Sequence, residues 1–278
     1  MPGANARALE KARGLAADAV LLDLEDAVAP QAKDSARTQV VAALASGDWS
    51  AERVIRVNGA GTPWHAGDLA AAAAARPDAV CLPKAESPEV IRAAAEALDR
   101  AGAPPGMALW AMIETPRGVL AAGEIARATP RLACLVAGTS DLVKDLRARH
   151  TPGRAEVLTS LSLVLLAARA AGLDALDGVF LDLTDAAGLE ASCRQGRDLG
   201  FDGKTLIHPS QLEAANRIFA PSTDELESAR RIVAAHAQAA AAGRGVAVVD
   251  GRLVEALHVA EAERILALAE RIARRANP

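Results

Sequence analysis

Residues 19–28 read AVLLDLEDAV, and this stretch is the clearest guide to the fold. Its first part, Ala19–Leu24, is a short apolar run interrupted by one carboxylate. Such a run is typical of a strand that is buried on both faces, as in a parallel sheet. Glu25 and Asp26 follow the run directly. The stretch therefore predicts a buried strand with acidic side chains at its carboxyl end.

Further apolar runs of the same kind recur along the chain, at Arg53–Asn58, Ala79–Pro83, Met107–Ile113, Ala133–Ala137, Gly178–Asp182 and Lys204–His208. Segments rich in Ala, Leu, Arg and Glu, such as Pro88–Arg100 and Arg154–Ala171, separate the runs and predict helices. The alternation predicts an α/β fold of the (β/α)8 TIM-barrel type, for which the first strand is missing from the chain. We expect that strand to lie upstream of Met1, or the barrel to be open at one seam. An open doubly wound sheet is the structural alternative, although no glycine fingerprint for a dinucleotide is present.

The pattern changes after His208, where helical segments dominate. Helices are predicted for Gln211–Ile218, Thr223–Ala242 and Val254–Arg275, and a turn or short ribbon for Gly245–Gly251. We predict a TIM-barrel catalytic domain at 1–220. Residues 221–278 are expected to form a C-terminal helical extension that caps the barrel mouth or reaches a neighbouring subunit.

The composition excludes several classes of protein. The formal net charge of −4 provides no basic excess for binding nucleic acid. No apolar run is long enough to span a bilayer, and the N-terminus lacks the apolar stretch of a signal peptide. The 3 cysteines have no CxxC spacing, which fits a reducing compartment. We therefore expect a cytoplasmic protein that binds neither nucleic acid nor membrane.

Polar side chains follow the predicted strands, where barrel enzymes place their active sites. Glu114 and Asp141 follow two neighbouring strands, and a pair of carboxylates is a hard oxygen site that suits Mg²⁺ or Mn²⁺. Two helix caps are the alternative explanation for this pair.

Two basic residues within the same set require an explanation. Arg56 lies between Ile55 and Val57 in an apolar strand, so it needs an anionic partner. That partner is either structural, such as Glu25 or Asp26, or a substrate carboxylate. Lys84 leaves the same two alternatives open.

Several motifs, taken in order, resemble the citrate lyase beta subunit-like and malyl-CoA lyase family within the HpcH/HpaI aldolase/citrate lyase superfamily. The resemblance covers nearly the whole chain. The motifs are Pro2-Gly3, LLDLEDAV (21–28) followed by Lys33 and Arg37, RVNGAGTP (56–63), LPKAES (82–87), IETPRGV (113–119), AGTSDL (137–142) and FDGKTLIHPSQ (201–211).

The resemblance implies a Mg²⁺-dependent carbon–carbon lyase that cleaves a 3-hydroxy-acyl thioester. The substrate would be of the citryl-CoA, malyl-CoA or citramalyl-CoA type, and the products a 2-keto acid and an acetyl- or acyl-thioester. The thioester carrier would be CoA or an acyl-carrier protein, and the assembly a homotrimer or hexamer.

The resemblance also implies roles for individual residues. Glu114 and Asp141 would bind Mg²⁺, with Glu114 also at the substrate, and Arg56 would contact the keto acid and its carbonyl oxygen. A further set would surround the metal and its waters, namely Glu25, Asp26 and Lys84.

Many members of this family carry an aspartate in a C-terminal G-x-M-[IV]-D segment, which serves as acid/base in the neighbouring subunit's site. Gly251-Arg-Leu-Val-Glu255 takes that place here, so we expect Glu255 to be the acid. Three alternatives to a lyase remain: an acyl-CoA thioesterase on the same scaffold, a 2-keto-acid aldolase, and a non-catalytic thioester-binding paralogue.

Overall fold

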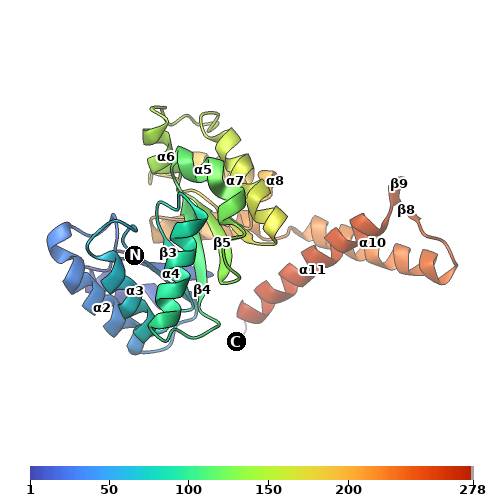
Figure 1. The fold of residues 1–278 in the computed structure, drawn as a ribbon. Helices are drawn as coiled ribbons and strands as arrows, with labels where there is room; N and C mark the ends of the chain where they lie inside the picture. Colours follow the sequence, from blue (N-terminus) through green and yellow to red (C-terminus); the bar gives the residue numbers. More distant parts are fainter. Residues whose placement is uncertain (277–278) are drawn as a thin grey trace. The chain divides into compact units, whose positions relative to one another are not determined.

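The computed structural model describes residues 1–276, and the chain divides into two compact units, Met1–Ala215 and Asn216–Pro278. The first unit is built on a parallel sheet whose strands follow one another in chain order (Figure 1). The strands are β1 (Ala19–Asp23), β2 (Glu52–Arg56), β3 (Ala79–Leu82), β4 (Ala108–Ile113), β5 (Leu132–Ala137), β6 (Asp174–Asp177) and β7 (Gly203–Lys204). The predicted α/β class and the parallel order are confirmed.

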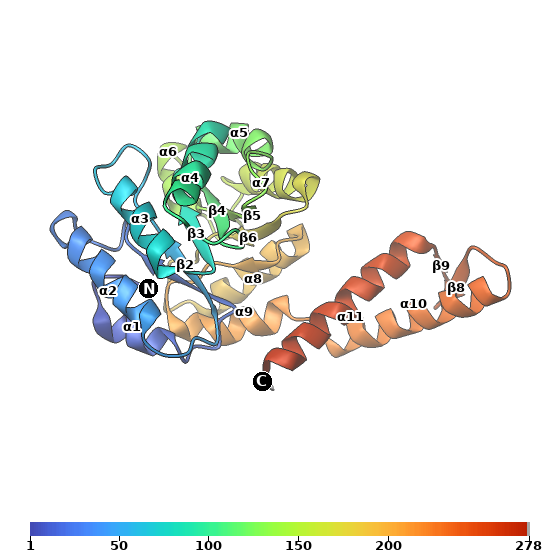
Figure 2. The ribbon, with the colours of Figure 1, turned by 60° about the horizontal axis from the view of Figure 1, so that its bottom comes forward.

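Helices of the first unit lie on the outer side of the sheet (Figure 2). They are α1 (Ala6–Ala12), α2 (Lys33–Ala45), α3 (His65–Ala75), α4 (Pro88–Arg100), α5 (Pro116–Ile125), α6 (Thr139–Asp145), α7 (Leu158–Ala171) and α8 (Ala186–Leu199), with 3-10 turns at Pro30–Ala32 and Pro209–Gln211. Side-chain caps fix where some of them begin. Thr115 accepts a hydrogen bond from the amide of Gly118 at 3.1 Å and so starts α5 directly after β4.

Alternate residues of β2–β5 form one buried apolar cluster that includes Val54, Cys81, Trp110 and Val136. The apolar runs form strands here because both of their faces are covered. Burial raises the pKa of the Cys81 thiol to about 12. This cysteine therefore acts as a small core residue rather than as a nucleophile.

Residues 1–276 do not form the eighth strand that a closed barrel requires. At the edge of β1 that does not face β2, one isolated parallel bridge joins Pro2 to Asp23. The Asp23 amide donates to the Met1 carbonyl at 2.8 Å, and the Gly3 amide donates to the Asp23 carbonyl at the same distance. Within residues 1–276 the strand order runs from β1 to β7, so the sheet has 7 strands.

The prediction for the sixth strand was wrong by four residues. The expected strand Gly178–Asp182 is a loop, and β6 lies at Asp174–Asp177 instead. Gly178 passes so close to α6 that a Cβ there would lie 2.3 Å from the Thr139 hydroxyl oxygen. The apolar side chains beyond it, such as Leu181, are half exposed. The prediction for the last strand, Lys204–His208, was too long and began one residue late, because β7 has only 2 residues, Gly203–Lys204.

The second unit contains helices and one short hairpin. After α9 (Leu212–Phe219), which crosses the boundary between the units, come α10 (Thr223–Ala241), β8 (Ala247–Val249), β9 (Arg252–Val254) and α11 (Ala256–Ala276). Asp250 and Gly251 join the two strands with φ values of +50° and +75°, as a two-residue hairpin turn requires. No helix within residues 1–276 has the length and apolarity to cross a bilayer.

Three charged side chains are buried together where β6 and β7 end. Arg154 places Nη1 at 2.7 and 2.8 Å from the two carboxylate oxygens of Asp177, and Lys204 places Nζ at 2.8 Å from the same carboxylate. The side chains of Asp177 and Lys204 have no exposed area. Burial lowers the pKa of Lys204, although the charge of Asp177 opposes that shift. One carboxylate therefore compensates two buried cations.

Replacing Asp177 with Ala should lower the free energy of unfolding by about 3–5 kcal/mol, because Arg154 and Lys204 would lose their buried anionic partner. Urea denaturation followed by circular dichroism measures the effect. The matched control is Glu96→Ala, which removes an exposed pair with Arg100 at 3.5 Å and should cost at most about 0.5 kcal/mol. Similar, small losses in both variants would contradict a structural role for the cluster.

Candidate active site at the strand ends

The site begins with an ion pair between the last residues of β1 and β2. Asp23 and Arg56 are register partners in the sheet. Arg56 donates from Nε to Asp23 Oδ1 at 2.7 Å and from Nη2 to Oδ2 at 2.6 Å. Burial alone would raise the pKa of Asp23, but Arg56 and two backbone amides outweigh it and hold that pKa below its ordinary value. The main partner of Arg56 is thus Asp23, which was not expected from the sequence, and Glu25, one of the two expected structural partners, is a second partner at 3.2 Å.

Glu25 bridges the two basic residues of the site. Its Oε2 lies 3.2 Å from Arg56 Nη1, and its Oε1 lies 2.6 Å from Lys84 Nζ. Burial raises the pKa of Glu25 even though both cations oppose that shift. Asp26 is exposed, and its nearest oxygen lies 3.9 Å from Lys84 Nζ.

The ammonium of Lys84 lies among the carboxylates. Besides Glu25, its Nζ is 3.5 Å from Asp141 Oδ2 and 4.0 Å from Glu114 Oε1. Burial would lower the pKa of Lys84, but Glu25 and the neighbouring carboxylates raise it above its ordinary value. The residue has a φ of +47°, in the left-handed region that side chains other than glycine rarely adopt. The backbone of the β3–α4 loop thus turns this side chain toward the acidic cluster.

Glu114 follows β4 and is 3 % exposed. Its Oε1 accepts a hydrogen bond from the Lys84 amide at 2.8 Å. Burial raises the pKa of Glu114 to about 7, against the effect of that amide and of the Lys84 ammonium. Space for the side chain depends on Gly138, where a Cβ would lie 2.3 Å from Glu114 Cβ and 2.7 Å from its Oε2.

Asp141 completes the cluster from the first turn of α6, directly after β5. Its side chain is one quarter exposed, and its Oδ1 lies 3.9 Å from Lys144 Nζ. The Lys84 ammonium thus faces both Glu114 and Asp141, which come from the ends of neighbouring strands. The structure therefore brings together the two residues that the sequence analysis expected to bind metal.

The residues present fit a divalent cation. Asp23 compensates Arg56 and Glu25 compensates Lys84, which leaves the charges of Glu114, Asp141 and Asp26 in excess. Within residues 1–276, no group of three or more His, Cys, Asp or Glu side chains is arranged as a complete ligand set. Mg²⁺ is commonly held by one or two carboxylates together with waters, so a pair of carboxylates is a sufficient set of protein ligands for it.

Two residues that support the site were not identified from the sequence. Asp68 on α3 is 1 % exposed and accepts hydrogen bonds through Oδ2 from the amide and the side chain of Asn58, at 2.9 and 2.6 Å. Lys33 was noted only as part of a motif, yet it is buried against the turn that carries Glu25. A charged residue within the alanine-rich stretch 65–75 was the available signal for Asp68.

Glu255 belongs to the second unit, in the link between β9 and α11. It is exposed, and its backbone amide donates to His258 Nδ1 at 3.1 Å. The other predicted site residues all belong to the first unit.

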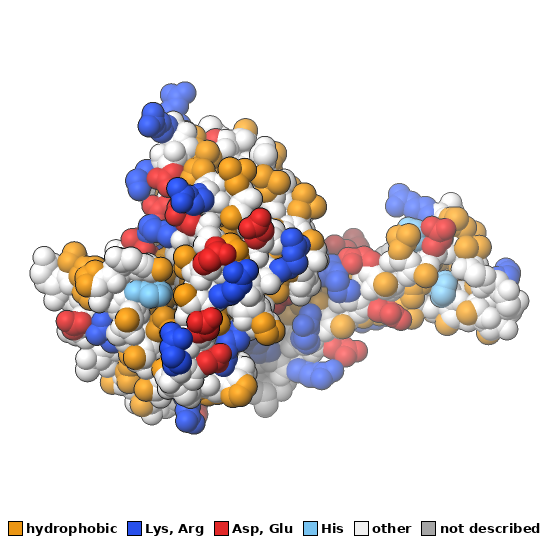
Figure 3. All heavy atoms as spheres, viewed as in Figure 1, with side chains coloured by type: hydrophobic (Ala, Val, Ile, Leu, Met, Phe, Trp, Pro, Cys, Tyr) orange, Lys and Arg blue, Asp and Glu red, His pale blue; other side chains and the backbone are white. Residues whose placement is uncertain are grey.

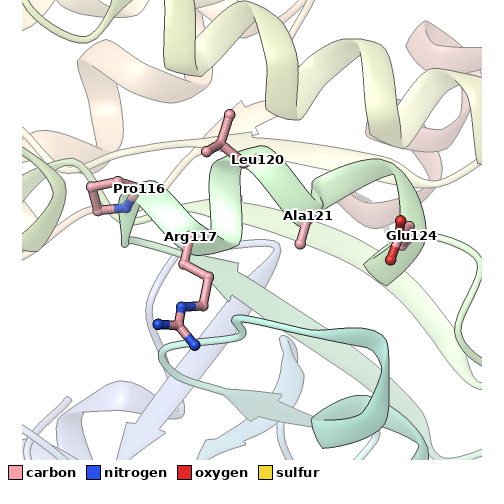
Figure 4. A pocket seen from close by; sticks show the side chains of 5 residues that line it. All are labelled: Pro116, Arg117, Leu120, Ala121 and Glu124. Carbon is pink, nitrogen blue, oxygen red and sulfur yellow. The ribbon is translucent and has the colours of Figure 1, made fainter.

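A hollow of about 520 Å³ lies elsewhere on the first unit, along α5 (Figure 4). Its lining consists of Pro116, Arg117, Leu120, Ala121 and Glu124, and Leu120 is 85 % exposed. None of the clustered carboxylates lines it, so the chemistry described above is separate from it. On the face drawn in Figure 3, basic and acidic side chains are intermixed rather than gathered by sign.

Comparison with known proteins gives a consistent result. The profile of the HpcH/HpaI aldolase/citrate lyase family matches residues 1–209. The chain is 50 % identical over 274 residues to the (3S)-malyl-CoA thioesterase of Cereibacter sphaeroides, which covers 98 % of this chain and 94 % of that protein. It is 36 % identical to the citrate lyase subunit beta of Escherichia coli K12, with 97 % and 91 % covered.

A solved structure is similar along almost the whole chain. It is CitE of Mycobacterium tuberculosis in complex with magnesium, acetoacetate and coenzyme A. The TM-score is 0.81 at 34 % sequence identity, with 97 % of this chain and 96 % of that one covered.

Replacing Lys84 with Met should tighten Mg²⁺ binding about tenfold, because it removes a positive charge within 4.0 Å of Glu114 and Asp141. Glu114→Gln should instead weaken the binding strongly. Isothermal titration calorimetry with Mg²⁺ measures both, and Lys11→Met, a surface substitution on α1, is the control. Unchanged or weaker binding by Lys84→Met would show that the ammonium does not compete with the cation.

Proposed function

Because the chain belongs to the HpcH/HpaI aldolase/citrate lyase family, we propose that it acts with Mg²⁺ on a 3-hydroxy-acyl thioester of coenzyme A. The reaction is hydrolysis of a malyl-CoA-type thioester to free CoA and the hydroxy acid. The observation that carries this choice is the 50 % identity, over 98 % of the chain, to a (3S)-malyl-CoA thioesterase. The cluster supports it in two ways: Arg56 and Lys84 are donors for an anionic substrate, and Glu114 and Asp141 are carboxylates for the Mg²⁺.

Glu114 and Asp141 are the proposed ligands of Mg²⁺. The bound cation supplies Lewis-acid polarisation of substrate oxygen atoms. The burial of Glu114 and the space left by Gly138 support this assignment, since a buried carboxylate gains most from a cation.

Arg56 is the proposed contact for a substrate oxygen. Asp23 occupies its Nε and Nη2, so the guanidinium is fixed in direction. Nη1 lies 3.2 Å from Glu25 Oε2 and donates to the weak acceptor Met112 Sδ at 3.8 Å, so it is the donor that we assign to a substrate oxygen. A fixed donor stabilises a developing negative charge better than a mobile one, because no reorganisation is needed during the reaction. In hydrolysis that charge develops on the thioester oxygen as water adds to the carbonyl carbon. The carbon–sulfur bond then breaks, and the sulfur leaves as the CoA thiol after taking up a proton.

Carbon–carbon cleavage is the second candidate, favoured by the 36 % identity to a citrate lyase subunit beta. In that reaction the hydroxyl loses its proton and becomes a carbonyl group. The bond between the hydroxyl-bearing carbon and the carbon beside the thioester breaks, and its electron pair stays with the thioester fragment as an enolate. Arg56 would stabilise the hydroxyl oxygen, and Glu255 would protonate the carbon of the departing enolate. The products are a 2-keto acid and an acyl thioester.

The proposal includes the assembly and the location. We place the protein in the cytoplasm as a homotrimer or hexamer, with Glu255 of one subunit serving the site of another. The carrier is CoA rather than an acyl-carrier protein. The malyl-CoA thioesterase relative and the CoA-containing structure of a similar protein support that choice.

Incubation with malyl-, citramalyl- and citryl-CoA and Mg²⁺ tests the function. Hydrolysis releases free thiol without 2-keto acid, whereas cleavage releases 2-keto acid and leaves the thiol acylated. We expect thiol release from malyl-CoA, its loss after removal of Mg²⁺ by a chelator, and a fall of at least about a hundredfold in Glu114→Gln. Keto acid without thiol would replace hydrolysis by lyase activity. Turnover of none of the three thioesters would refute both candidates.

Mixing two inactive variants tests delivery of Glu255 between subunits. In carbon–carbon cleavage, where Glu255 is the proposed acid, Glu255→Gln and Glu114→Gln should each be inactive alone. They should recover part of the lyase activity after subunit exchange, because mixed assemblies then contain some sites with both carboxylates. Exchange is verified with differently tagged chains. If exchange occurs without recovery, Glu255 does not act across subunits. Full activity of Glu255→Gln alone would show that it is not the acid.

A further inference from the structure

One face of α2 supports both loops that carry the charged residues of the site. Lys33 is the first residue of α2, and Arg37 lies one turn later on the same side. In Figures 1 and 2, α2 lies beside α3, which carries the partner of Arg37. Arg37 also pairs with Asp34 on α2 at 2.9 Å, but the other contacts of Lys33 and Arg37 lead out of the helix, to the loops after β1 and β2.

Lys33 holds the turn after β1. It is 6 % exposed, and its Nζ donates to the carbonyls of Leu24 and Glu25 at 2.8 and 2.7 Å. The ammonium also lies 5.4 Å from the centroid of the Trp64 ring. A buried ammonium whose hydrogen bonds go to backbone carbonyls fixes backbone geometry, because each carbonyl has a defined direction for its hydrogen bond. One carbonyl belongs to the peptide group before Glu25 and the other to the peptide group after it. Lys33 therefore holds the backbone of Glu25 on both sides.

The turn after β1 closes on itself around the same residue. The amides of Glu25 and Ala27 donate to the Asp23 carboxylate at 2.9 and 3.1 Å. The Val28 amide donates to the Glu25 carbonyl at 3.0 Å, which is one of the two carbonyls held by Lys33. Loss of the ammonium would therefore loosen the amides of residues 25–28 together.

Arg37 holds the loop after β2 through a relay. Its Nε donates to Asp68 Oδ1 at 2.7 Å, and the other carboxylate oxygen of Asp68 accepts the two hydrogen bonds from Asn58. Asn58 is two residues beyond Arg56 and is 2 % exposed. Gly67 leaves room for the guanidinium, since a Cβ there would lie 3.2 Å from Arg37 Cζ.

We propose that Lys33 and Asp68 are positioning residues, which set Glu25 and Arg56 in the geometry that binds the thioester substrate. Lys33 acts on the turn that carries Glu25, and Asp68, steered by Arg37, acts on the loop that follows Arg56. The role in substrate binding rests on the proposed function, whereas the support of each loop is independent of it. Since a shift of about 1 Å at a binding group costs up to about a hundredfold in rate, two anchored loops have a direct effect on turnover.

Hydrogen–deuterium exchange of two variants tests the inference. Lys33→Met keeps the length of the side chain without its charge, and Asp68→Asn keeps the shape without the carboxylate. We expect the amides of residues 25–28 to exchange at least about tenfold faster in Lys33→Met, and those of residues 58–62 in Asp68→Asn, each with little change in the other loop. Asp177→Ala is the matched control, because it destabilises the same unit at another place and should speed exchange evenly over the unit, with no preference for either loop.

Steady-state kinetics on the thioester that the wild type uses provide the second measurement. Each variant should raise KM by about tenfold or more, whereas Asp177→Ala should leave KM unchanged in the folded fraction. Unchanged exchange in the expected loop, or faster exchange spread evenly over the unit, would overturn the support of that loop. Faster local exchange with an unchanged KM would overturn the positioning role.

Two further outcomes are distinguishable. If the wild type turns over no thioester, the proposed function fails, and the exchange rates alone decide whether α2 holds the two loops. If Lys33→Met does not fold, Asp68→Asn still decides the inference for the loop after β2. Lys33→Arg then decides it for the turn after β1, because the guanidinium keeps donors for both carbonyls.

Discussion

The carboxylate of Asp23 is the interaction on which the site depends. It accepts two hydrogen bonds from Arg56 and two from backbone amides of the following turn. A buried carboxylate must have its acceptors satisfied, and this requirement fixes the turn and the guanidinium at the same time. Because Asp23 and Arg56 are opposite each other in the β1–β2 register, a shift of that register by one residue would separate them. The register of the sheet therefore also sets the direction in which the Arg56 guanidinium points.

Negative charge is in excess over positive charge at the strand ends. Desolvation penalises every carboxylate placed there, and Arg56 and Lys84 compensate only part of that penalty. Glu114 shows the remainder most clearly, because its pKa is raised to about 7 in the absence of a metal. A divalent cation relieves this imbalance more effectively than a further lysine, since it brings two charges and accepts oxygen ligands from several directions.

The sequence predicted the fold well where local pattern decides structure. The runs that became β1–β5 are apolar and buried on both faces, so composition alone marks them. Gly178–Asp182 misled the prediction, because its apolar residues form a half-exposed loop and the strand before it, Asp174–Asp177, carries two aspartates. There the pairing with β5 and the buried partners of Asp177 outweigh local propensity.

The candidate site was predicted in its members but not in its contacts. Motif order pointed to Arg56, Glu114 and Asp141. The structure places the two carboxylates within 4.0 Å of the Lys84 ammonium and links Arg56 to that ammonium through Glu25. Sequence spacing could not show that Arg56 faces Asp23, because that pairing arises only when two strands meet in register. Gly138 has a consequence of a different kind. Every substitution of Gly138 adds a Cβ that displaces the Glu114 side chain. A chain can therefore lose the site although all of the charged residues of the site are still present in its sequence. A degenerate copy of this gene would pass a check of its acidic and basic residues and would be recognised only by the missing glycine.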